Sequence, residues 1–166
     1  MDQIKTFIKN INQSHAYLLS LNDQDSNSVI NLLESSLLAS GKTSLENIKA
    51  VEQVLSTFLY ENGIIIDKYY YCYHHPDGVV AEYSGECKCR KPGTLFLEDA
   101  IEKFNLNAKD CWFVGDRDTD VECGKAMGMR TVQVKNKHSG SKAGKETPDE
   151  FAADIYEAVL KIVERG

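Results

Sequence analysis

The chain has 166 residues, of which 42% are hydrophobic, and a chain of this size and content can bury one core. The formal net charge of −6 argues against binding to nucleic acid or to an anionic membrane surface, because either would require a basic face. No apolar run approaches the ~20 residues needed to span a bilayer, so we expect a soluble, cytoplasmic protein.

Residues 1–40 are predicted to be helical. Apolar residues recur at helical spacing in two stretches, which are Ile4, Phe7, Ile8 and Ile11, and then Val29, Ile30, Leu33 and Leu37. The polar residues 22–27 between these stretches have turn and N-cap chemistry. A further helix is predicted over 44–62, with a buried stripe made of Ile48, Val51, Val54, Leu55, Phe58 and Leu59.

The rest of the chain alternates between extended and helical patterns. An extended apolar run at 64–72 leads into a loop at 72–92. The elements predicted after it are a helix at 93–105, a strand at 111–114, a helix at 119–127, a strand at 130–134, a loop at 135–148 and a last helix at 149–163. Such alternation indicates an α/β, Rossmann-like architecture with a parallel sheet.

A cluster of cysteines and a histidine in the loop at 72–92 has the spacing Cys-x-His-x12-Cys-x-Cys. Its members are Cys72, His74, Cys87 and Cys89. Three thiolates and an imidazole suit a four-coordinate structural zinc site, and nothing in the chain resembles a secretory signal that would favour disulfides. His75 is adjacent and could replace His74 as a ligand, although His74 gives the tighter Cys-x-His spacing. We expect Cys111 and Cys123 to be buried thiols in a strand and a helix.

An acidic turn follows the strand at 111–114, where Asp116 and Asp120 lie four residues apart. Open α/β sheets bind ligands at the carboxyl ends of their strands, and carboxylates there suit a hard cation such as magnesium. Taken alone, such a turn is also an ordinary helix N-terminus. The adjacent cations Arg90 and Lys91, presented by the upstream metal loop, favour a phosphoryl-binding site.

Residues 40–134 resemble the haloacid dehalogenase (HAD) superfamily, specifically its zinc-loop heptose 1,7-bisphosphate phosphatases, with histidinol phosphatases as the nearest relatives. The segments that carry the resemblance are 70–76 (YYCYHHP), 87–92 (CKCRKP), 114–120 (VGDRDTD) and 124–128 (GKAMG). The resemblance implies that Lys91 steadies the charge of the nucleophile and the phosphate, while Arg90 contacts the substrate and Arg117 holds a cationic position. It also implies that Asp116 ligates magnesium with support from Asp120.

Two motifs of that family are absent from the sequence. The family's nucleophile is the first Asp of an Asp-x-Asp-Gly-Thr motif after the central strand, and a Thr-Asn-Gln-Ser-Gly motif follows the next strand; residues 34–37 (ESSL) do not preserve the latter. Asp23 and Asp25 form the one Asp-x-Asp upstream of the zinc loop, and we expect them in a turn between helices, which makes Asp23 a weak candidate nucleophile. We therefore expect a reduced sheet of three strands (68–72, 111–115 and 130–134) covered by the helices of 1–40.

Residues 1–42 resemble the first helices of sedoheptulose 7-phosphate isomerases, without that family's glycine-rich sugar-phosphate loop. The expected organisation is a helical segment at 1–42, able to support homo-oligomers, and a HAD-like phosphatase domain at 43–166. The implied function is that of a sugar-bisphosphate phosphatase with structural zinc and catalytic magnesium. The alternatives are a catalytically incomplete, zinc-bound scaffold or partner protein, and a helical oligomerisation module.

Overall fold

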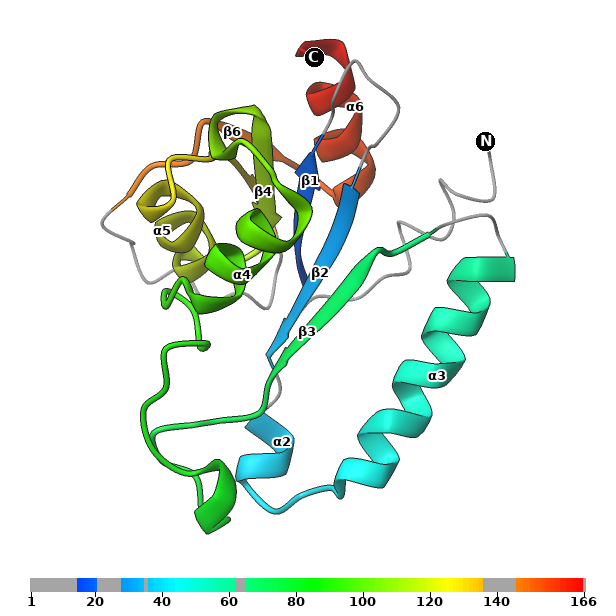
Figure 1. The fold of residues 1–166 in the computed structure, drawn as a ribbon, viewed down its shortest axis with the longest axis vertical. Coiled ribbons are helices and arrows are strands. Elements are labelled where there is room, and N and C mark those ends of the chain that lie inside the picture. The colour runs from blue at the N-terminus through cyan, green and yellow to red at the C-terminus, as the bar shows by residue number, and fades with distance from the viewer. Residues whose placement is uncertain (1–14, 21–27, 35, 62–64, 136–145, 166) are drawn as a thin grey trace.

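Six strands form one sheet in the computed structural model, which describes residues 15–20, 28–34, 36–61, 65–135 and 146–165 (Figure 1). The strands are β1 (His15–Ser20), β2 (Ser28–Glu34), β3 (Lys68–Cys72), β4 (Cys111–Gly115), β5 (Arg130–Val134) and β6 (Glu150–Ala152). The helices are α2 (Ser36–Ala39), α3 (Leu45–Glu61), α4 (Leu95–Phe104), α5 (Asp118–Ala126) and α6 (Ile155–Arg165). The strand order is β3-β2-β1-β4-β5-β6, and the α/β class predicted from the sequence is confirmed.

The central strand β1 runs against both of its neighbours. Tyr17 lies opposite Val114 of β4 and opposite Asn31 of β2, and both pairings are antiparallel. The β2–β3, β4–β5 and β5–β6 pairings are parallel. The expected all-parallel sheet is therefore a mixed one, in which β1 is the strand of opposite direction.

The expectations of helices throughout 1–40 and of a reduced, three-stranded sheet are wrong. Residues 15–20 and 28–34 are strands that fill the space between β3 and β4. A short apolar run does not distinguish strand from helix by its periodicity, and here the unpaired edges of β3 and β4 decide, because buried backbone groups need partners. Residues 1–14 lie outside the described residues, so the helix expected there stays a prediction.

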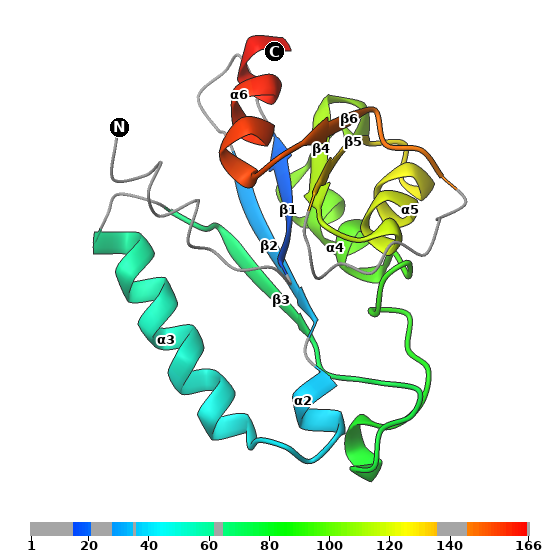
Figure 2. The same cartoon turned by 180° about the vertical axis from the view of Figure 1, so that it is seen from behind.

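The sheet packs a separate apolar cluster on each face. Alternate residues of β4 divide between the faces: Cys111 and Phe113 pack with α4 and α5, whereas Trp112 and Val114 pack with α6. Figure 2 shows α3 and α6 on the side of the sheet away from α4 and α5. The buried thiols predicted at Cys111 and Cys123 are confirmed, because both side chains are fully buried.

Elements in the second half of the chain closely follow the sequence prediction. The helices expected at 93–105 and 119–127 are α4 and α5, and the strands expected at 111–114 and 130–134 are β4 and β5. The last helix was expected from 149, but 150–152 form β6, and α6 begins only at Ile155. β6 pairs with β5 in parallel. Residues 150–152 are too few to show a strand pattern in the sequence, so this pairing makes them a strand.

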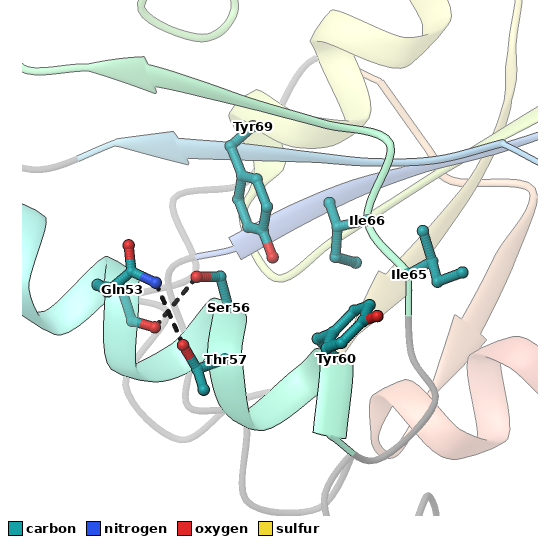
Figure 3. Close-up of a pocket in the computed structure, with 7 residues that line it drawn as sticks. All are labelled: Gln53, Ser56, Thr57, Tyr60, Ile65, Ile66 and Tyr69. Carbon is teal, nitrogen blue, oxygen red and sulfur yellow. Dashed lines mark hydrogen bonds between the residues drawn. The ribbon is translucent and has the colours of Figure 1, made fainter.

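Helix α3 confirms the helix predicted at 44–62 but not its buried stripe. Leu59 is buried, whereas Val51 and Val54 are exposed by 69% and 71%. A pocket of about 370 Å³ lies on another flank of α3, where Tyr60 faces Ile65 and Tyr69 (Figure 3). Among the described residues, neither α3 nor any other helix is long and apolar enough to cross a membrane.

Candidate functional site

The four predicted zinc ligands converge at the end of β3. Cys72 ends the strand, His74 follows it, and Cys87 and Cys89 return on the far side of the loop. The Sγ atom of Cys89 lies 3.3 Å from that of Cys72, 3.2 Å from that of Cys87 and 3.7 Å from Nδ1 of His74. Tetrahedral zinc with Zn–S bonds near 2.3 Å separates its sulfur ligands by about 3.7 Å. The cluster therefore fits a zinc ion, with the four ligand atoms within 4.8 Å of one another.

The neighbouring residues distinguish His74 from His75. Nδ1 of His75 accepts a hydrogen bond from the backbone N–H of Asp77 at 3.1 Å, within a turn of the loop. The ring of His74 instead packs edge-on against Tyr83 and presents Nδ1 to the thiols. Of the two alternatives left open by the sequence, the structure favours His74 as the ligand.

The three cysteine thiols of the cluster differ in pKa. Burial raises the pKa of Cys72 far above that of an ordinary thiol, and the hydrogen bond with Cys89 raises it further. Burial also raises the pKa of Cys89, with a further increase from Cys87. Burial acts in the same direction on Cys87, but the thiols of Cys89 and Cys72 stabilise its thiolate and lower its pKa overall. Binding of a zinc ion would therefore release protons, as is general for thiolate sites.

The metal loop positions the cations that follow it. Arg90 comes directly after Cys89 and donates from Nη1 to the backbone carbonyl of His74 at 3.0 Å. Lys91 is buried, and its Nζ lies 2.6 Å from Oδ1 of Asp120. Because both side chains of this pair are almost fully buried, the ion pair fixes the loop to the start of α5.

The acidic turn after β4 forms the other side of the site. Gly115 ends the strand, Asp116 follows and is 9% exposed, and Arg117 is exposed beside it. Oδ2 of Asp120 accepts from the backbone N–H of Arg117 at 2.9 Å. A Cβ atom on Gly115 would clash with Oδ2 of Asp120, so only glycine allows this approach. Asp120 thus serves both the backbone of the turn and the ammonium of Lys91.

The structure brings most of the predicted site residues to one edge of the sheet. Cys72, Gly115 and Glu34 all lie at the carboxyl ends of strands that run in the same direction, with Glu34 in register with Cys72. Lys91 joins them through its ion pair with Asp120. This is the edge at which open α/β sheets bind ligands.

The described residues do not include the candidate nucleophile predicted from the sequence. Asp23 and Asp25 lie outside them, so the weak candidacy of Asp23 stays a prediction. The direction of β1 bears on it, because Ser20, the last residue of β1, pairs with Cys111 at the opposite end of β4 from Asp116. The beginning of β1, not its end, therefore reaches the edge that carries Asp116.

One residue whose backbone lies at this edge was not among the site residues predicted from the sequence. Glu34 is the last residue of β2, and the backbone register places it beside Cys72. The available signal was its position at the end of the apolar residues 28–33, before two serines, which is the composition of a strand that ends at a polar turn. The expectation of a helix over this stretch concealed that signal.

Comparisons with known proteins agree with this geometry. The HAD-hydrolase-like family matches residues 88–158. The chain is 32% identical over 130 residues to the D-glycero-D-manno-heptose-1,7-bisphosphate 7-phosphatase of Chlorobaculum tepidum, an alignment that covers 74% of this chain and 65% of the relative. It is 38% identical over 84 residues to a D-glycero-alpha-D-manno-heptose-1,7-bisphosphate 7-phosphatase of Photorhabdus laumondii, covering 50% of this chain and 46% of the relative.

A solved structure shares the fold. The D,D-heptose 1,7-bisphosphate phosphatase of B. bronchiseptica, crystallised with magnesium and phosphate, superposes with a TM-score of 0.71 and 20% sequence identity over 84% of this chain and 75% of that chain. The chain spans 65% of the length of the Chlorobaculum relative and about half of the length of the other curated relatives that it matches.

Proposed function

We propose that the chain is a HAD-like hydrolase and, more narrowly, a phosphatase of the heptose 1,7-bisphosphate 7-phosphatase type that acts on a phosphorylated sugar. The observation that carries the proposal is the buried pair of Lys91 and Asp120 beside Asp116, attached directly to a zinc-type loop. Fixed cations next to a carboxylate at this edge are suited to a phosphate group.

Each residue then has a distinct task. Lys91, held by Asp120, would neutralise charge on the phosphate, and Arg90 and Arg117 would contact the substrate from the loop and from the helix start. Asp116 would hold magnesium, a hard cation that suits oxygen ligands and would supply electrostatic stabilisation of the phosphoryl group. Asp120 is engaged by Lys91 and by the backbone of Arg117, so its support of the metal site would be indirect.

The covalent step of the family requires a carboxylate that attacks phosphorus. Because β1 runs antiparallel to β4, its last residue, Ser20, lies at the opposite end of β4 from Asp116. Glu34 stands at the right edge by its backbone register. We therefore include Glu34 beside Asp23 as a candidate, and we expect slow phosphate release by the chain alone.

A second candidate function rests on the same observation about β1. A site that keeps the cations and Asp116 but lacks a carboxylate in the attacking position would bind phosphate and magnesium without hydrolysis. The protein would then be a zinc-bound phosphosugar-binding scaffold.

The two functions are separated by measuring binding and turnover on one preparation. Binding of heptose 1,7-bisphosphate with magnesium is followed by calorimetry, and phosphate release is followed under multiple turnover. Magnesium-dependent release that is abolished by Asp116→Asn, with the exposed Glu102→Gln as a matched control, supports the phosphatase. Loss of release in Glu34→Gln or Asp23→Asn identifies the nucleophile. Binding without release assigns the scaffold, and the absence of both contradicts the two proposals together.

A further inference from the structure

Helix α3 carries an apolar seam on one flank. Val51, Val54 and Phe58 follow the spacing i, i+3, i+7, and they are exposed by 69%, 71% and 44%. The contacts of α3 with β3 and the residue after it use another flank, where Glu52 accepts a hydrogen bond from the hydroxyl of Tyr73 at 3.1 Å. A seam of this spacing is the pattern that helices use to pack against one another.

We propose that residues 1–12 of this same chain form an amphipathic helix that docks on the seam. Those residues lie outside the described part of the chain, and their sequence carries the complementary pattern. Ile4, Ile8 and Ile11 are separated by four and then three residues. The seam read in the reverse direction, from Phe58 through Val54 to Val51, has the same separations. Two helices that run antiparallel therefore align all three apolar positions.

The topology requires that antiparallel direction. The segment must enter β1 at His15, which pairs with Leu33 one residue before the end of β2. That end of the sheet leads through α2 into the first turn of α3. A helix that ends near residue 12 therefore has its last turn beside the start of α3, which places Ile11 near Val51 and Ile4 near Phe58. Eight helical residues span about 12 Å on each partner, so the lengths agree.

The charges of the two segments are opposite in sign. Residues 1–12 contain one acidic residue, Asp2, and two lysines, Lys5 and Lys9. Helix α3 contains three glutamates, at 46, 52 and 61, and one lysine at 49. Electrostatic attraction therefore adds to apolar contact, and it disfavours pairing of α3 with a second, equally acidic α3.

The test is amide hydrogen exchange of residues 48–58 in the full chain, measured at two protein concentrations. Ile8→Asp and Val54→Asp each place a charge in the seam, and we expect each to accelerate exchange about tenfold, as loss of a buried aliphatic contact should. The matched controls add the same charge away from the seam, Thr6→Asp on the first segment and Gln53→Asp on α3, and should leave exchange unchanged. The double variant Ile8→Asp/Val54→Lys pairs opposite charges and should restore much of the protection.

Two results overturn the proposal. Exchange at 48–58 that is the same in the wild type and in Ile8→Asp shows that residues 1–12 do not cover the seam. Protection that increases with protein concentration, together with a dimeric mass by light scattering that Val54→Asp reduces to a monomeric one, shows that a second copy covers it instead. Because the variants lie outside the phosphate site, failure of this proposal leaves the proposed function untouched.

Discussion

Residues 68–165 and residues 15–61 differ in how their helices meet the sheet. In the first stretch α4, α5 and α6 enclose β4, whose residues Trp112, Phe113 and Val114 are at most 2% exposed. In the second stretch α3 buries only Leu59 among its described residues and leaves Val51 and Val54 about 70% exposed. The candidate phosphate-binding cations and Asp116 belong to the closely packed stretch, whereas Glu34, a candidate nucleophile under the proposed function, belongs to the other. Under the proposed function, binding of phosphate and attack on it would therefore depend on different parts of the chain.

Removal of the zinc site should have the largest effect, because the loop joins the two stretches. The backbone N–H groups of Val79 and Val80 both donate to the carbonyl of Ala39 at the end of α2. We expect one zinc per chain, and we expect His74→Ala to lose it and to lower the melting temperature by about 10 °C or more, since metal binding at such sites is coupled to folding. Metal analysis and thermal unfolding provide the measurement.

The neighbouring histidine is the matched control for this prediction. His75→Ala should keep the zinc, because His75 bonds within its own turn. Zinc-free wild-type protein, or zinc lost from His75→Ala and kept by His74→Ala, would contradict the ligand set.

Breaking the buried ion pair should have the next largest effect, confined to the closely packed stretch. Lys91→Met leaves the carboxylate of Asp120 buried without its cation, which typically costs about 3–5 kcal/mol of unfolding free energy. The double variant Lys91→Met/Asp120→Asn removes both charges and should recover much of that loss. Urea denaturation of the single and double variants measures the coupling. Equal stability of Lys91→Met and the wild type would show that the pair does not hold the loop.

Two glycines offer a smaller and sharper test of packing at the turn. Gly115→Ala places a Cβ atom against Asp120 and should destabilise the fold by about 2–3 kcal/mol, because the buried carboxylate must move. Gly128→Ala meets no atom within 4 Å and suffers only from its positive φ of 73°, at about 1 kcal/mol. Denaturant unfolding compares them, and a larger loss for Gly128→Ala would refute the close approach at Gly115.

The smallest expected effect concerns Asp149, whose carboxylate accepts hydrogen bonds from Lys125 of α5 and from Thr131 of β5. Partial burial would raise the pKa of Asp149, but hydrogen bonds from Lys125 and Thr131 outweigh it and hold this pKa below the ordinary 3.8. A depressed pKa stabilises the fold above pH 4 and ceases to do so as the pH falls through the folded-state value. Asp149→Asn should therefore be slightly less stable than the wild type at pH 7, and the difference should shrink below pH 4. Thermal unfolding across this range checks the sign, and a difference that grows in acid would contradict it.

The sequence predicted those parts of the site whose residues lie close together in the chain. Cys72, His74, Cys87 and Cys89 were found from spacing and donor chemistry alone, because ligands from two short segments of one loop need little tertiary information. The turn at Gly115 and Asp116 was found in the same way, from a strand that ends in an acidic helix start. Spacing favoured His74 over the adjacent His75, and the structure groups the ring of His74 with the three thiols.

The sequence by itself determined the α/β class, the zinc-type loop and the elements from 93 to 134, because their helix ends and their apolar or β-branched strands are recognisable from local sequence alone. Tertiary structure decided the identity of residues 15–20 and 28–34. Their short apolar runs are compatible with helix or strand, and the unpaired edges of β3 and β4 selected strand through hydrogen bonds to segments distant in sequence. Tertiary structure also decided the direction of β1. Because β1 pairs with β4 in the antiparallel sense, the beginning of β1, and not its end, lies at the edge that carries Asp116.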